Sequence, residues 1–229
     1  MKQDGISKYK LDKIATESLR NSLRLHFDSI LLFNNESYPS AFQLSVLSLE
    51  ELSKAKWVEH YIYSSETNSG YPDEEFEQEW LKLLYLHPKK QWNFIARETN
   101  DYSPKFVSFV QNRKLEEKKQ NAIYVGLARS KGKIDVSSRV STPLRIKKKD
   151  AVQIISLLNS EFLCICQRIE DEEFYFDGSS NMDDVFDYDI FNKLFKWPHK
   201  SGLKNSGWWK RNRNNAVRCN KKTPHVGCQ

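Results

Sequence analysis

Apolar and small residues recur every three to four positions along the first third of the chain, which is the spacing of an α-helix. A first stripe, over residues 10–33, consists of Leu11, Ile14, Ala15, Ser18, Ser22, Leu25, Ser29, Leu32 and Phe33. A second stripe begins after Tyr38-Pro39 and consists of Ala41, Leu44, Ser48, Leu52, Ala55, Val58 and Ile62. Serine within such a stripe permits close helix packing, because its hydroxyl can bond back to its own backbone. The pattern therefore predicts a tightly packed pair of long helices.

An acidic residue, Glu51, falls inside the apolar stripe of the second helix. Glu50 and Lys54 lie on the flank of that stripe, four residues apart on a shared face. A buried carboxylate is costly unless it is paired or neutralised, so Glu51 requires a partner. Two interpretations remain open: a functional carboxylate, or a structural network that holds the helices in register.

Helical patterns continue after a polar loop at residues 64–73, but they are shorter. Phe76, Trp80, Leu83, Leu84 and His87 share one stripe, and Pro88 must either kink that helix or start a new one. Further helices are predicted over residues 105–126, 148–169 and 183–197, with an irregular basic stretch at 126–143. The strand signal is weak throughout. An all-α antiparallel helical bundle is therefore predicted.

The net charge of +6 conceals a strong separation of charge along the chain. Residues 106–149 contain twelve Lys/Arg and three acids, residues 170–189 contain nine acids and no base, and residues 200–229 contain eight bases and no acid. Basic segments of this kind attract polyanions, although a solvated surface with offsetting charges is an equally open interpretation. Periodicity is lost after Pro198. We therefore expect a helical domain at 1–198 and a basic, flexible tail at 199–229.

Several classes of protein are disfavoured by the composition. No run approaches the roughly 20 apolar residues that span a bilayer, and the first residues lack a signal segment, so a cytoplasmic protein without membrane contact is expected. Four cysteines form no disulfide framework, and Cys219, Cys228 and His225 supply only part of a zinc site. Neither a metal nor a cofactor is therefore expected.

Four ordered segments resemble the AbiV family of bacterial abortive-infection proteins, within the HEPN group of helical bundles. They are residues 38–54, 87–90, 119–125 and 151–162, and the resemblance covers roughly residues 19–166. It implies a role in phage defence, in which the protein halts growth of an infected cell, and a bundle that often forms homodimers. The expected partners are RNA, a phage-encoded activator protein and a second copy of the chain.

The resemblance leaves enzymatic activity open. Many HEPN proteins are metal-independent ribonucleases that use an Arg and a His four to six residues apart, placed across a dimer interface. Arg20 and His26 have this spacing but point about 120° apart on one helix. Arg218 and His225 also fit, but they lie in the expected tail. Ribonuclease activity is therefore not secured by the usual motif of the group.

A different constellation is the candidate site. Glu51 and His87 occupy stripes that adjacent helices would bring together, with lysines at the rim. The imidazole would remove the proton of an RNA 2′-hydroxyl, a carboxylate would fix its tautomer, and the lysines would stabilise phosphate charge. A purely structural network, with Glu51 bonded to His87, a lysine or Tyr124, remains the alternative. The candidate catalytic residues are His87, Glu51, Lys54, Lys90 and Glu50.

Basic and aromatic residues outside this constellation are candidates for RNA binding. Trp208-Trp209-Lys-Arg-Asn-Arg213 combines rings with cations and is suited to stack on and neutralise single-stranded RNA, although a tail with incidental tryptophans is the alternative. The full set is Lys118, Lys119, Tyr124, Trp208, Trp209, Arg211 and Arg213. The functional hypothesis is an effector that cleaves or engages RNA and blocks translation. The alternative is a non-catalytic effector that binds a phage protein or the translation machinery.

Overall fold

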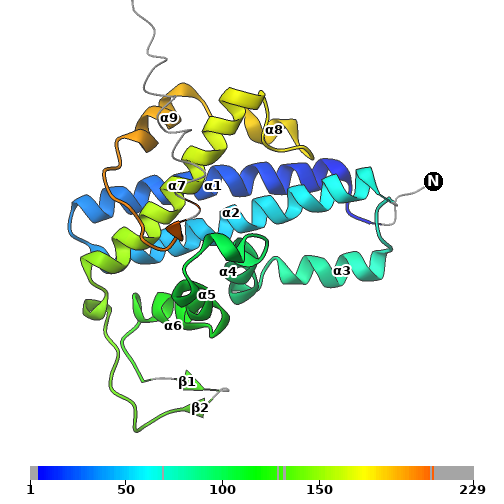
Figure 1. The fold of residues 1–229 in the computed structure, drawn as a ribbon. Coiled ribbons are helices and arrows are strands. Elements are labelled where there is room, and N and C mark those ends of the chain that lie inside the picture. The colour runs from blue at the N-terminus through cyan, green and yellow to red at the C-terminus, as the bar shows by residue number, and fades with distance from the viewer. Residues whose placement is uncertain (1–4, 69, 128, 131–132, 207, 209–229) are drawn as a thin grey trace, which may run out of the picture.

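Two long antiparallel helices, α1 (Lys8–Asn34) and α2 (Tyr38–Thr67), form the centre of the molecule (Figure 1). The computed structural model describes residues 5–68, 70–127, 129–130, 133–206 and 208. The serines predicted to allow close packing link the pair directly. Ser22 Oγ donates to the Ser48 carbonyl oxygen at 2.6 Å, and Ser48 Oγ donates to the Ser22 carbonyl oxygen at 2.7 Å. Such reciprocal bonds require close backbones, so small residues at this crossing fix the distance between the helices.

Shorter helices cover this pair from several sides. α7 (Lys148–Glu172) crosses the pair, and α3 to α6 lie along the α2 side (Figure 1). These helices are α3 (Glu74–Leu83), α4 (His87–Ala96), α5 (Pro104–Gln111) and α6 (Lys114–Asn121). The remaining elements are η1 (Thr99–Asp101), β1 (Arg129–Ser130), β2 (Lys133–Ile134), η2 (Pro143–Arg145), α8 (Ser180–Asp183) and α9 (Tyr188–Phe195). The predicted all-α bundle is confirmed.

At Pro88 the structure selects one of the two predicted alternatives, whereas the helix predicted over residues 105–126 is divided. A new helix, α4, starts at His87, so Pro88 lies in its first turn, where a missing N–H costs no hydrogen bond. The single helix predicted over residues 105–126 is wrong: α5 and α6 are separate, and between them Arg113 has a φ of 57°. Phe76 is also exposed rather than in the core. Its neighbour Glu77 is buried instead, because it accepts hydrogen bonds from the Ile6 amide and the Tyr61 hydroxyl.

The packed part of the chain continues past Pro198, contrary to the expected tail boundary at 199. Ser201, Lys204 and Trp208 are buried, and the Ser103 amide donates to the Leu203 carbonyl at 2.8 Å. This segment therefore joins the bundle, and residues 209–229 lie outside the described part of the chain. Within that described part, none of the helices has both the length and the apolar composition needed to cross a membrane.

Candidate functional site

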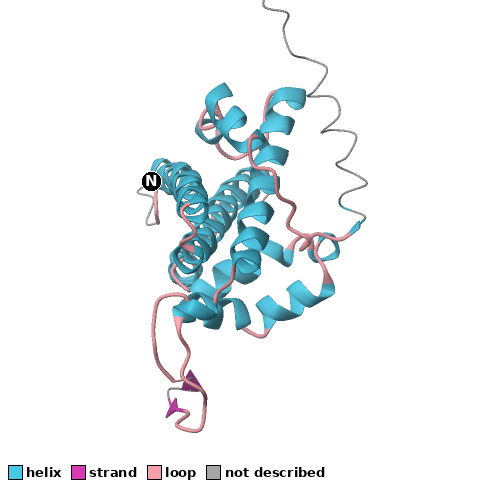
Figure 2. Ribbon diagram, turned by 90° about the vertical axis from the view of Figure 1, so that its left-hand side faces the viewer, coloured by secondary structure: helices cyan, strands magenta, loops and turns pink. Residues whose placement is uncertain are grey.

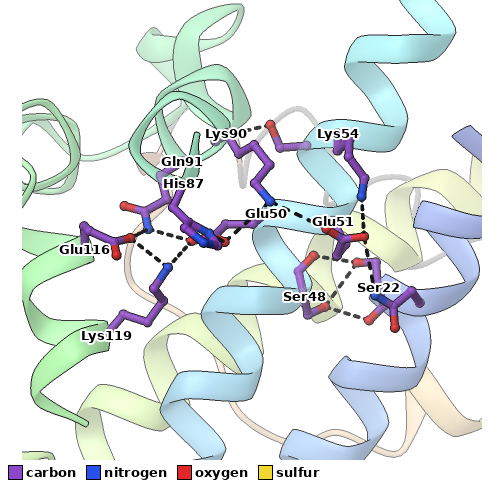
Figure 3. A network of polar contacts seen from close by, with 12 residues as sticks. Ser22, Ser48, Glu50, Glu51, Lys54, His87, Lys90, Gln91, Glu116 and Lys119 are labelled. Atoms are coloured by element: carbon purple, nitrogen blue, oxygen red, sulfur yellow. Dashed lines mark hydrogen bonds and ion pairs between the residues drawn. The ribbon is translucent and has the colours of Figure 1, made fainter. Parts of the chain in front are cut away.

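A buried carboxylate, Glu50, is the centre of a polar network between α2, α4 and α6 (Figure 3). Its side chain is 1% exposed, and three groups donate to it. His87 Nδ1 lies 2.5 Å from Oε2, while Lys119 Nζ and Gln91 Nε2 lie 2.8 Å and 2.7 Å from Oε1. Lys90 Nζ adds a second ammonium 3.8 Å from Oε2, and together these contacts offset the cost of removing a carboxylate from water.

The buried acid that binds His87 is Glu50 and not Glu51, so the prediction for this pair is wrong. The Glu51 side chain is 16% exposed, lies 2.8 Å from Lys54 and 3.6 Å from Lys90, and does not contact His87 (Figure 3). The reason is that α2 is central, so its buried residues do not form a single stripe. A stripe drawn through Ala41 and Ser48 follows the side facing α1. Glu50 instead belongs to the side covered by α4 and α6.

His87 is also placed differently, because it is the first residue of α4 and its side chain is 49% exposed. A carboxylate only accepts hydrogen bonds, so the Nδ1 that faces Glu50 must carry a proton. In the neutral imidazole this leaves a lone pair on Nε2, which has no hydrogen-bond partner among the described residues. The half-exposed ring can therefore accept a proton from an outside group. The imidazole and a carboxylate do meet, as hypothesised, but with Glu50 in place of Glu51.

Two lysines of the constellation, Lys90 and Lys119, are not at its rim, whereas Lys54 is partly exposed. Lys90 and Lys119 are buried, and Lys119 Nζ lies 2.8 Å from both Glu50 and Glu116. Burial opposes ionisation of Glu116, but hydrogen bonds from Lys119 and Gln120 outweigh it and lower the pKa of that carboxyl. These ammonium groups neutralise buried acids, so they cannot also reach an RNA phosphate.

Two further residues of the network, Gln91 and Glu116, were not predicted from the sequence. Each has a weak local signal: Gln91 follows His87 by four residues, and Glu116 precedes Lys119 by three, so each shares a helix face with a network member. Gln91 Nε2 also donates to Glu116 at 2.7 Å, which links α4 to α6. In the described part of the chain, no group of three or more His, Cys, Asp or Glu side chains could hold a metal ion.

The candidate RNA-binding residues are dispersed. Tyr124 is exposed, and Lys118 is partly exposed with its Nζ 2.6 Å from Asp150. Trp208 is buried with its ring 4.7 Å from Lys204 Nζ, so the expectation that it stacks on RNA is wrong. The other members, Trp209, Arg211 and Arg213, lie outside the described residues, as do Arg218, Cys219, His225 and Cys228.

Arg20 and His26 point apart, as their helical spacing indicated. Arg20 is exposed and pairs with Glu17, whereas His26 is buried with Nε2 3.1 Å from Asn159 Oδ1. The Asn159 amide donates to the Leu194 carbonyl, so its oxygen faces the imidazole and Nε2 is the donor. Nδ1 is then buried without a hydrogen-bond partner among the described residues. Burial lowers the pKa of His26 from 6.5 to about 4.

We expect His26 to make folding sensitive to mild acid. Because its pKa is about 6.5 unfolded and about 4 folded, the stability it contributes is present above pH 6.5 and is lost as the pH falls to 4. The loss should reach about 3 kcal/mol, measurable by urea unfolding across this range. His26→Gln retains a donor for Asn159 but cannot titrate, so it should lack this component. An equally steep loss in His26→Gln would contradict the assignment.

A family model described as AbiV matches residues 10–163. The matched region includes every member of the Glu50 network and ends within α7, before the packed segment that follows Pro198. Neither the curated proteins nor the solved structures provide a match.

Proposed function

This chain belongs to the AbiV family, and we propose that it arrests the growth of phage-infected cells by cleaving or engaging RNA and so blocking translation. The family implies abortive infection, a form of phage defence, as the general role. The proposal of RNA as the target rests chiefly on the His87–Glu50 pair. A half-exposed imidazole held by a fully buried carboxylate is the arrangement expected of a positioned general base.

The pair supports cleavage of RNA without a metal. His87 Nε2 would take the proton of a 2′-hydroxyl, whose oxygen attacks the adjacent phosphorus as the bond to the 5′-oxygen breaks. The leaving 5′-oxygen takes a proton from water, and the products are a 2′,3′-cyclic phosphate and a 5′-hydroxyl. Glu50 would hold the required tautomer and stabilise the imidazolium that forms. It is a positioning residue, because the RNA would not touch it.

Phosphate charge would be met by the start of α4 rather than by Lys90 and Lys119. This helix begins at His87 without a side-chain cap, so its dipole favours an anion near the imidazole, although Pro88 has no N–H and the Lys89 and Lys90 amides already donate to the Leu86 carbonyl. Lys89 is exposed two residues further on and adds a positive charge. Both features lie at the same end of α4 as the ring.

Substituting His87 tests the catalytic proposal. Purified His87→Ala should remain folded but lose RNA cleavage by roughly 100-fold or more, because general bases contribute about 10²–10⁴-fold. The assay is incubation of total RNA with protein in a chelating buffer, followed by mapping of 2′,3′-cyclic phosphate ends. His60→Ala, which changes another exposed histidine, is the matched control. Cleavage that survives His87→Ala would remove this residue from the mechanism.

The alternative is a non-catalytic effector that binds a phage protein or the translation machinery. It is favoured by the full neutralisation of Glu50, since Lys119 and Gln91 bind it as in a structural network. A phage-encoded activator and a homodimer fit either proposal. The non-catalytic form predicts growth arrest without RNA ends, and toxicity that persists in His87→Ala.

A further inference from the structure

A basic arm extends from the bundle between α6 and α7 (Figures 1 and 2). We define it as residues 122–127, 129–130 and 133–147. Its base is closed by Gly126 and Ser141, each of which donates its amide to the carbonyl of the other, at 3.2 Å and 2.7 Å. Beyond that bridge, β1 and β2 pair in antiparallel register. The segment is thus a two-stranded ribbon that leaves the packed helices.

The arm carries cations that its own acids do not offset. Asp135 is the one acid in residues 122–149, and its carboxylate accepts the Ser137 amide and hydroxyl. Exposed cations of the arm and the adjoining start of α7 are Lys133, Arg139, Arg145, Lys147, Lys148 and Lys149. Among the described residues, none forms an ion pair with Lys133, Arg139 or Arg145. Unpaired exposed cations on one projection create a positive potential that draws a polyanion.

The base of the arm adjoins the candidate site. Lys119, which binds Glu50, lies two residues before the end of α6, and the arm begins directly after that helix. Lys118 pairs with Asp150 in the first turn of α7, which fixes the other side of the base. Tyr124, three residues after the end of α6, is exposed and presents a ring on which a base can stack. A strand held along the arm would therefore pass close to the α4–α6 side of the bundle.

We propose that the basic arm is the RNA-binding element of the protein and contacts the phosphate backbone without reading sequence. This inference rests on the proposed action on RNA and names the surface that holds it. The arm also exposes Ile134, Val136, Val140 and Leu144, which suit a protein partner. RNA is favoured because its continuous phosphate backbone can contact all the unpaired cations at once. A protein that bound only the aliphatic residues would leave those cations without a partner.

The test is RNA binding by full-length protein carrying His87→Ala, so that cleavage cannot alter the probe. A fluorescent single-stranded RNA of about 20 nucleotides is titrated at several salt concentrations. Adding Lys133→Gln, Arg139→Gln and Arg145→Gln should weaken binding roughly tenfold to a hundredfold and reduce the salt slope by about 2, because each lost phosphate contact removes about 0.7. The matched control replaces three exposed cations of α1, with Lys10→Gln, Lys13→Gln and Arg20→Gln. It should bind like the parent.

Other results of these experiments would contradict either the arm assignment or the ribonuclease proposal. Equal binding by the arm and α1 variants would overturn the proposal. So would an equal loss of RNA affinity in Val136→Ser/Val140→Ser with the salt slope unchanged, which would show that apolar contacts rather than the cations hold the RNA. If RNA binds through the arm but wild-type protein leaves it intact, the arm assignment stands and the ribonuclease proposal falls. If the three arm substitutions leave RNA cleavage unchanged in protein that retains His87, the ribonuclease proposal stands and the arm assignment falls.

Discussion

Glu50→Ala is expected to lower the free energy of unfolding by about 3–5 kcal/mol, because it leaves buried ammonium groups without their carboxylate. Lys119 would keep only Glu116, and Lys90 would keep only Glu51 at 3.6 Å. His87 would also lose the acceptor that fixes its tautomer. Urea unfolding followed by circular dichroism measures the change in stability. Growth arrest after induced expression measures the change in function, which we expect to be lost.

Glu51→Ala is the matched control, because it removes the neighbouring carboxylate of the same helix. Glu51 is partly exposed and pairs with Lys54 near the surface, so its loss should cost about 1 kcal/mol or less. Glu50→Gln separates charge from shape: it retains a buried acceptor but cannot neutralise Lys119. Equal destabilisation by Glu50→Ala and Glu51→Ala would contradict the assignment of the buried position to Glu50.

The long helices could be predicted because their information is local. Helical spacing of apolar residues and serines defines α1 and α2, and the reciprocal bonds between Ser22 and Ser48 show why small residues were required there. The end of the pattern at Pro88 was also visible, although the choice between a kink and a new helix was not. Local pattern therefore determined most of the secondary structure.

The choice between Glu50 and Glu51 depended on tertiary structure. Neighbouring residues of a helix point about 100° apart, so either acid could face a partner. Because α2 is covered by α1, α4, α6 and α7, it has no single polar face. Its sequence therefore does not show which of the two acids is buried. Gln91 and Glu116 approach Glu50 only when α4 and α6 pack on that helix. The site therefore needed long-range contacts that periodicity does not encode.

The segment after Pro198 shows the same limitation at a second buried cluster. Lys204 pairs with Glu161 of α7 and lies 4.1 Å and 4.7 Å from the ring centroids of Tyr102 and Trp208. Lys56 Nζ lies 3.4 Å from the other oxygen of Glu161. Composition suggested a solvated basic tail, because a lysine is rarely buried without a partner. That partner, Glu161, lies 43 positions before Lys204 in the chain.

Glu161→Leu is therefore expected to destabilise the protein by about 3–5 kcal/mol and to release the segment around Lys204. Burial disfavours the charged form of Glu161, but Lys56 and Lys204 outweigh it and lower the pKa of that carboxyl. Removing it leaves Lys204 fully buried and unneutralised. Urea unfolding gives the energy, and limited proteolysis with mass spectrometry shows whether the chain becomes cleavable near residue 204.

The double variant Glu161→Leu/Lys204→Met decides whether buried charge is the cause. An apolar pair of similar volume leaves no buried charge without a partner, so the double variant should recover much of the stability lost in Glu161→Leu. Lys204→Met alone should cost less than Glu161→Leu, because Lys56 still neutralises the carboxylate. If the two single effects simply add in the double variant, Lys204 and Glu161 are not coupled. In that case the segment after Pro198 is held by Trp208 and its backbone bonds instead.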